Sequence, residues 1–238
     1  MSIVWNPWHG CHKLSEGCLN CYVYRIDGKF DRDPSKIILN ADCDLPIRKN
    51  KKGEWIIPSG ETVYTCLSSD FFIEEADEWR ARTWEYIRQR SDVNFVIITK
   101  RILRFGISLP EDWGCGYDNV TIGCTCENNR RAAERLPFFL KFPIKHRFII
   151  CEPMLEYVDF KRWMLSEKIE KVSVGGESGE NARICDFDWV RQTAEDAKSC
   201  GVGFEYHQTG ARLKKDGKIY QIPRQLQASQ ARKAGLDQ

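Results

Sequence analysis

Six short apolar runs, rich in β-branched residues, recur along this chain and limit the folds that it can adopt. They follow one another at intervals of about 24 to 32 residues, and they cover 62–67, 93–98, 120–124, 147–151, 171–174 and 202–206. Between them lie stretches whose apolar side chains have helical spacing, at 74–90, 128–140 and 186–200. Such alternation predicts strands and helices of a parallel α/β sheet, and continuous apolar runs are typical of strands covered on both faces.

The number of runs predicts the architecture. With one more strand near the N-terminus they indicate a single α/β domain over residues 1–210, folded as a partial or full TIM-like barrel, with a doubly wound sheet as the alternative. A chain of 238 residues suits one domain of this kind. Residues 50–54 are expected to form an exposed loop. Residues 211–238 are basic and irregular, and we expect a tail that packs on the barrel or extends from it.

Composition excludes some classes of protein. Charged residues make up 29% and hydrophobic residues 42%, and the formal net charge is +2, so bulk charge selects no partner. We expect no membrane partner, because no run of ~18 apolar residues occurs, and the first seven residues lack the basic segment and apolar run of a secretory signal. Eleven cysteines without such a signal favour the cytoplasm, where cysteine clusters tend toward metal binding or catalysis.

Three cysteines, Cys11, Cys18 and Cys21, form a cluster in which the gaps are six and then two residues. Three thiolates can hold three irons of a 4Fe-4S cluster and leave the fourth iron open. A structural zinc site that uses His9 or His12 as its fourth ligand is an alternative. A third interpretation is a set of unrelated cysteines in a surface loop.

Each predicted strand ends in a short polar cluster. The clusters are Ser68-Ser69-Asp70, Thr99-Lys100-Arg101, Thr125-Cys126-Glu127-Asn128, Glu152-Pro153, Gly175-Gly176-Glu177-Ser178 and His207-Gln208. Parallel α/β folds build their sites at the C-terminal ends of strands. Six clusters in series therefore predict one pocket.

The motifs also resemble a known family. The opening Trp5-Asn6-Pro7, Gly10-Cys11 and Ser15-x-Gly17-Cys18-x-x-Cys21-Tyr22 is similar to that of a three-cysteine family common in phages and prophages. Later motifs follow in the family's order: Ser69-Asp70-Phe71-Phe72, Ile98-Thr99-Lys100-Arg101, Glu127-Asn128, Glu152-Pro153-Met154-Leu155, Gly175-Gly176-Glu177-Ser178-Gly179 with Ala182-Arg183, and His207-Gln208-x-Gly210. The cysteines and the strand rhythm resemble the radical S-adenosylmethionine superfamily, although the usual first gap there is three residues.

The resemblance implies an enzyme with two cofactors. A 4Fe-4S cluster on Cys11, Cys18 and Cys21 would bind S-adenosyl-L-methionine at its open iron, take an electron from an external donor and generate a 5′-deoxyadenosyl radical. The residues expected to bind the cofactor are Tyr22, Ser69, Asp70, Lys100, Arg101, Gly175, Gly176, Glu177, Ser178, Arg183, His207 and Gln208.

Three further residues are candidates for catalysis. Glu127 and Glu152 close successive strands, and one of them could act as acid or base. Cys126 lies two residues after Cys124, so the two side chains share a face of a strand, and Cys126 could donate a hydrogen atom. The structural alternatives are buried, hydrogen-bonded carboxylates and cysteines that pack in the core.

The substrate is the least constrained expectation. Cations and donors among the strand-end residues suit an anionic ligand, such as a nucleotide or nucleic acid, and the basic residues from Arg212 to Arg224 could extend that surface. The rival function is a non-catalytic module, stabilised by zinc or an iron–sulfur cluster, that binds nucleic acid or a protein partner.

Overall fold

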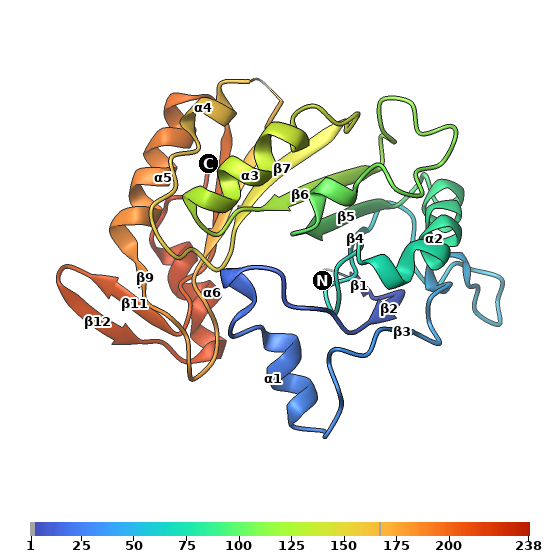
Figure 1. The fold of residues 1–238 in the computed structure, drawn as a ribbon, viewed down its shortest axis with the longest axis horizontal. Coiled ribbons are helices and arrows are strands. Elements are labelled where there is room, and N and C mark those ends of the chain that lie inside the picture. The colour runs from blue at the N-terminus through green and yellow to red at the C-terminus, as the bar shows by residue number, and fades with distance from the viewer. Residues whose placement is uncertain (1–2, 167) are drawn as a thin grey trace. The chain divides into compact units, whose positions relative to one another are not determined.

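Seven strands form one sheet in this computed structural model, which describes residues 3–166 and 168–238. The order in the sheet is β1-β4-β5-β6-β7-β8-β10. The strands are β1 Ile3–Trp5, β4 Thr62–Thr65, β5 Asn94–Thr99, β6 Val120–Thr125, β7 His146–Cys151, β8 Lys171–Gly175 and β10 Gly203–Gln208. All six predicted runs are strands, and β1 is the expected strand near the N-terminus (Figure 1).

The strand order decides between the two predicted topologies. The pairs β1–β4, β4–β5, β7–β8 and β8–β10 are parallel. A doubly wound sheet reverses its strand order at a switch point, whereas this order follows the chain throughout, as in an α/β barrel. The strands β1 and β10 stand at the two ends of that order. The fold is therefore α/β with a partial TIM-like barrel, as predicted.

The helices begin and end where local sequence signals place them. The three predicted helices are present as α2 Asp77–Gln89, α3 Asn129–Phe139 and α5 Phe187–Ser199. Asn128 caps α3 by accepting a hydrogen bond from the backbone of Arg131, and Asp186 caps α5 in the same way. Shorter helices are α1 Tyr22–Gly28, α4 Lys161–Met164 and α6 Arg224–Lys233, and single 3-10 turns are η1 Glu16–Cys18, η2 Leu45–Ile47, η3 Glu74–Ala76 and η4 Ile102–Arg104.

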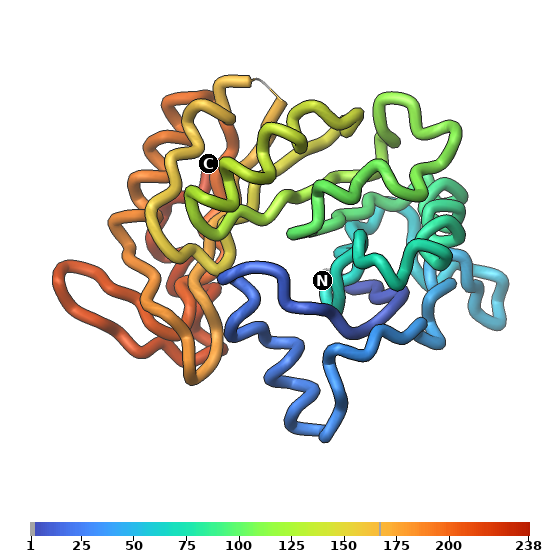
Figure 2. Tube along the Cα trace, viewed as in Figure 1, coloured from blue at the N-terminus to red at the C-terminus, as the bar shows by residue number. Residues whose placement is uncertain are grey.

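The chain divides into two compact units. The first comprises 1–12, 26–123 and 141–146, and the second comprises 13–25, 124–140 and 147–238. The first unit holds a core of edge-to-face aromatic rings, in which Phe71 contacts Trp84 and Phe72. Its long, mostly irregular stretch between α1 and β4 contains β3 Ile38–Leu39, which pairs with β2 Trp8–His9 from before α1, and the exposed turn at 50–54 (Figure 2).

The second unit contains a second, three-stranded sheet. Its order is β12-β11-β9, formed by β9 Cys185–Asp186, β11 Arg212–Lys215 and β12 Lys218–Gln221. The helix α6 then packs on β10. The expectation of an irregular tail after Gly210 is wrong, because this segment forms a regular hairpin and a helix (Figure 1, red).

Candidate functional site

The segment 15–21, here called the cysteine loop, carries Cys18 and Cys21 in the second unit. Cys18 closes η1, and Cys21 directly precedes α1. Both thiols are half-buried and neither is in a disulfide. The surrounding side chains show how this loop is held.

Glu127, just after β6, forms hydrogen bonds with the first residues of the cysteine loop. It is fully buried, and its Oε1 accepts hydrogen bonds from the Gly17 amide at 3.2 Å and from the Ser15 hydroxyl. Its Oε2 forms an ion pair with Arg135 at 2.8 Å. A Cβ at Gly17 would lie 3.0 Å from the Glu127 carboxyl group, so glycine leaves the room for this approach. Glu127 therefore holds the cysteine loop as a buried, hydrogen-bonded carboxylate, which was the structural alternative considered from the sequence.

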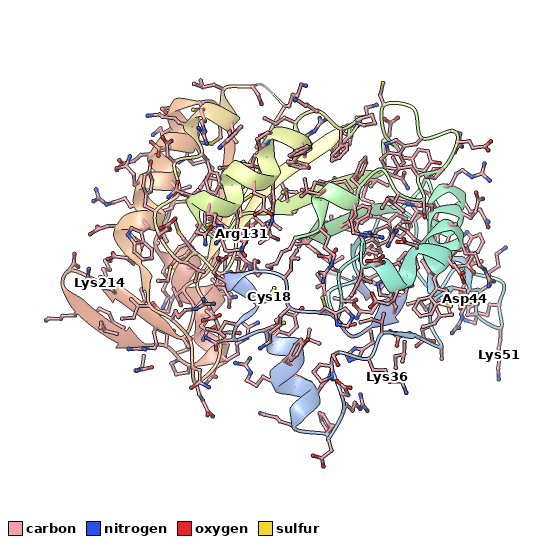
Figure 3. The ribbon with its side chains drawn as sticks, in the orientation of Figure 1. Cys18, Lys36, Asp44, Lys51, Arg131 and Lys214 are labelled. Atoms are coloured by element: carbon pink, nitrogen blue, oxygen red, sulfur yellow. The ribbon has the colours of Figure 1, made fainter. Side chains whose placement is uncertain are left out.

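Arg131 holds the same loop from α3. Its Nε and Nη2 donate to the two carboxylate oxygens of Glu16 at 2.9 and 3.1 Å. This pairing lowers the pKa of Glu16 to about 2. Figure 3 labels Arg131 on α3, the helix that follows β6. Sequence reasoning missed Arg131 and Arg135, although their spacing of four puts them on one face of a helix.

Glu177, in the Gly-Gly-Glu motif after β8, is a third charged side chain that bonds to the cysteine loop. Its carboxylate accepts from Arg183 Nη2 at 2.6 Å, from Arg183 Nε at 2.9 Å and from Asn20 Nδ2 at 2.9 Å. Burial opposes ionisation of Glu177, but these hydrogen bonds outweigh it and lower the pKa. Arg183 also donates to the Glu16 carbonyl at 2.9 Å. Glu177 and Arg183 thus hold the cysteine loop, and Asn20 is a further residue that the sequence did not reveal.

The two glycines of this motif allow the backbone to approach its neighbours. A Cβ at Gly176 would lie 2.3 Å from the Thr209 carbonyl oxygen, and one at Gly175 would lie 2.9 Å from the Glu152 carboxyl carbon. Next to them, the Ser178 carbonyl accepts a hydrogen bond from Arg25 at 2.8 Å. These residues shape the loop after β8.

Glu152, at the end of β7, organises the end of β10. Its Oε2 lies 2.8 Å from His207 Nδ1, and its Oε1 accepts from Gln208. Adjacent residues reach one carboxylate because the β8–β10 register shifts between Tyr206 and Gln208, as in a bulge. The hydrogen bond and charge of Glu152 raise the pKa of His207, whose side chain is 55% exposed.

Cys126 and Cys124 lie within the core of the second unit. Their Sγ atoms are 3.9 Å apart, and both side chains are fully buried. Burial, with the neighbouring Cys124 thiol, raises the pKa of Cys126 well above its ordinary value. The shared face predicted from the sequence is confirmed, and the surroundings are those of core packing.

In the first unit, Asp70 organises the ends of β4 and β5. Its carboxylate accepts from Thr99 Oγ1 at 2.7 Å and from the Lys100 amide at 2.9 Å, and it lies 3.5 Å from Arg101 Nη1. Asp70 is almost fully buried. The predicted strand-end residues of β4 and β5 are thus brought together in one network.

That network contacts the segment with Cys11. Arg101 donates to Cys11 Sγ at 3.5 Å and to the His12 carbonyl at 2.7 Å. Ser69 donates to the Gly10 carbonyl. The strand ends of this unit therefore hold the first cysteine of the motif.

The remaining candidates are Tyr22 and the side chains of His9 and His12. Tyr22 is exposed on α1. His9 and His12, considered as zinc ligands, pair instead with Asp27 at 2.7 Å and with Glu75 at 2.5 Å. In the described part of the chain, no helix is both long and apolar enough to cross a membrane.

The three cysteines of the motif do not all belong to one unit, so the surroundings of each are described within its own unit. Cys11 belongs to the first unit, and Cys18 and Cys21 belong to the second. Among residues 3–166 and 168–238, no three His, Cys, Asp or Glu side chains are grouped as metal ligands. The chemistry of Cys11, Cys18 and Cys21 nevertheless fits an iron–sulfur cluster. All three are half-buried thiols outside any disulfide, and polar side chains hold the segments on which they lie.

Comparison with known proteins gives one match. A family described as "Protein of unknown function (DUF5131)" matches residues 1–235. No curated protein and no solved structure matches the chain. These comparisons therefore assign no activity to the chain.

Proposed function

The chain belongs to the DUF5131 family of proteins of unknown function, and from its own residues we propose that it is a radical S-adenosylmethionine enzyme with a 4Fe-4S cluster on Cys11, Cys18 and Cys21. The observation that carries this proposal is the way in which the cysteine loop is held. Three charged side chains from two strand ends and a helix, Glu127, Glu177 and Arg131, all bond to this loop.

Holding a loop with buried charged side chains costs free energy, which indicates that the position of the cysteine loop matters. Burying a charge costs free energy, and the cost is offset only where each charge is paired and hydrogen-bonded. Glu127 and Glu177 are both buried and both paired with arginines. They fix Cys18 and Cys21 at the C-terminal ends of β6 and β8, the end at which α/β barrels carry their sites.

When bound, a cluster with one open iron would pass an electron from an external donor to S-adenosylmethionine, and the resulting 5′-deoxyadenosyl radical would take a hydrogen atom from the substrate. Arg101 donates a hydrogen bond to the Cys11 sulfur, a contact of the kind that tunes such clusters. His207 is held at Nδ1 by Glu152, which leaves Nε2 to exchange a proton with a substrate.

The substrate and location complete the proposal. The donors and cations of the strand ends, such as Lys100 and Arg101, suit an anionic substrate, and we propose a nucleotide or nucleic acid. All eleven cysteines are free, which suits the reducing cytoplasm.

The test is anaerobic reconstitution with iron and sulfide. Wild-type protein should turn brown and bind iron and sulfide, and replacement of Cys11, Cys18 or Cys21 by alanine should abolish both. Cys115→Ala is the matched control, because Cys115 is an exposed free cysteine outside the motif. Reduced, reconstituted protein should convert S-adenosylmethionine to 5′-deoxyadenosine and methionine.

Two results would count against the proposal. Full iron and sulfide content in Cys18→Ala protein would defeat the ligand assignment. A colourless protein that retains zinc would favour the non-catalytic module.

A further inference from the structure

Charge is unevenly distributed along this nearly neutral chain. Residues 211–238 contain seven of the 36 lysines and arginines but two of the 34 acidic residues, a formal charge of +5. Residues 1–210 therefore carry −3. The positive charge is gathered on the β11–β12 hairpin and on α6, and Figure 3 labels Lys214 on that hairpin.

The hairpin places like charges opposite one another. The turn residues Asp216 and Gly217 both have positive φ, 51° and 72°, as a two-residue type I′ turn requires. The register pairs Lys215 with Lys218 across this turn, on the same face of the hairpin. Like charges directly opposite each other destabilise an antiparallel pair, so the fold alone gives no reason for this pairing.

The outer strand of the hairpin is open to solvent. All four residues of β12 are exposed, and β12 is the edge of its sheet. Tyr220 is 45% exposed and stands on the same face as Lys218, two residues away. This face therefore alternates cations with an accessible aromatic ring.

Lysines on an edge strand can have another role, which is to prevent edge-to-edge aggregation. A protective edge would not expose Ile219 and Tyr220 beside the lysines. Lys215 is held over the Phe187 ring at 4.8 Å, so its position is fixed. Within the described residues, Lys218 has no ion-pair partner. The hairpin tip thus offers two cations and one ring to a ligand.

We propose that the β11–β12 hairpin binds single-stranded nucleic acid, with phosphates on Lys215 and Lys218 and an unpaired base stacked on Tyr220. Proteins that bind single strands combine such cations with aromatic stacking platforms, and stacking on an exposed ring requires a base that is not paired. That the bound strand is a substrate rests on the proposed function, whereas the binding itself does not.

The experiment measures fluorescence anisotropy of labelled oligo-dT and oligo-U of about 20 nucleotides with the full-length protein over a salt series. Wild-type protein should bind both, with affinity that falls as salt rises. The double variant Lys215→Gln/Lys218→Gln should bind more weakly, and its slope of log affinity against log salt should be shallower by about 1.4, because each lost phosphate contact removes about 0.7. Tyr220→Ala should weaken binding about 5-fold or more.

The matched control is Lys51→Gln/Lys52→Gln, which removes the same charge from the exposed turn of the first unit (Figure 3). It should bind as wild type does, and an equal loss of affinity there would reduce the effect to net charge and overturn the proposal. Undetectable binding at low salt, or a duplex bound as tightly as the single strands, would also overturn it. Measurement on Cys18→Ala protein separates the two ideas, because strand binding should persist there when the cluster is lost.

Discussion

At the scale of single residues, Glu127 and Arg135 form a buried ion pair in the candidate site. Both side chains are almost wholly buried, and the distance between Oε2 and Nη1 is 2.8 Å. In Glu127→Ala protein, Arg135 would keep its hydrogen bond to the Thr125 carbonyl but lose its counter-charge. We expect a loss of about 3–5 kcal/mol in the free energy of unfolding, measured by urea denaturation, because one partner of a buried ion pair is left alone.

The control for this prediction lies on the same helix. Glu134 pairs with Arg131 at an exposed position, and Arg131 also retains Glu16. Glu134→Gln should therefore cost less than about 1 kcal/mol. Equal losses in the two variants would contradict a special role for the buried pair.

His207 gives a prediction about pH. Its pKa is raised by Glu152, with Glu205 acting in the same sense and Arg224 against it. A raised pKa means that the protonated ring stabilises the fold; this contribution is complete below the unfolded value of about 6.5 and is lost as pH rises through the folded value. In Glu152→Gln protein the pKa of His207 should fall, which NMR titration of the four histidine rings can measure.

The assignment of that signal is direct. The resonance missing from the His207→Gln spectrum identifies the ring. An unchanged pKa of His207 in Glu152→Gln protein would show that the two side chains are not in contact in solution.

At the scale of elements, the end of β8 is fixed by backbone packing. A methyl group at Gly176 would lie 2.3 Å from the Thr209 carbonyl oxygen and 2.8 Å from the Gly210 Cα. Neither contact involves a flexible side chain that could move away. Gly176→Ala should therefore cost at least about 1–3 kcal/mol, the usual range for overpacking, and should lower the melting temperature.

Gly28→Ala is the matched change for that prediction. Gly28 ends α1, and nothing lies within 4 Å of the position of its Cβ. Its melting temperature should equal or slightly exceed that of the wild type, because alanine favours helix. If both variants melt alike, the close approach of β8 to the chain after β10 is not rigid.

The same elements show what the sequence could and could not predict. Most strands of the large sheet were predictable from their apolar residues: β6, β7 and β8 are almost continuously buried, and β4, β5 and β10 bury alternate residues. The hairpin was missed because β12 is wholly exposed and has no apolar alternation. Asp216-Gly217 was the available signal, since Asp-Gly favours a two-residue turn between strands.

At the scale of the whole molecule, the strand-end motifs follow the strands as predicted, whereas the hydrogen-bond partners of their side chains could not be predicted. Glu127 and Glu177 were predicted as a reacting and a cofactor-binding group, and the structure adds that both form hydrogen bonds with the cysteine loop. Spacing along the chain predicts which residues follow strands. It does not show which carboxylate an arginine six or eight residues away will neutralise, because that depends on the packing of separate elements.

The division of the cysteines between the two units leads to a last prediction. Cys11 lies in the first unit, and Cys18 lies in the second. The proposed cluster on Cys11, Cys18 and Cys21 would stabilise the folded chain, because a ligand bound only by the folded state adds about 4 kcal/mol at a thousandfold excess over its Kd. For a chain of this length that corresponds to a rise of roughly 10 °C in the melting temperature. Calorimetry of reconstituted protein against cluster-free protein should show this rise in the wild type and in Cys115→Ala, and should show none in Cys11→Ala or Cys18→Ala. A rise that survives in Cys11→Ala but disappears in Cys18→Ala would assign the metal to the second unit alone.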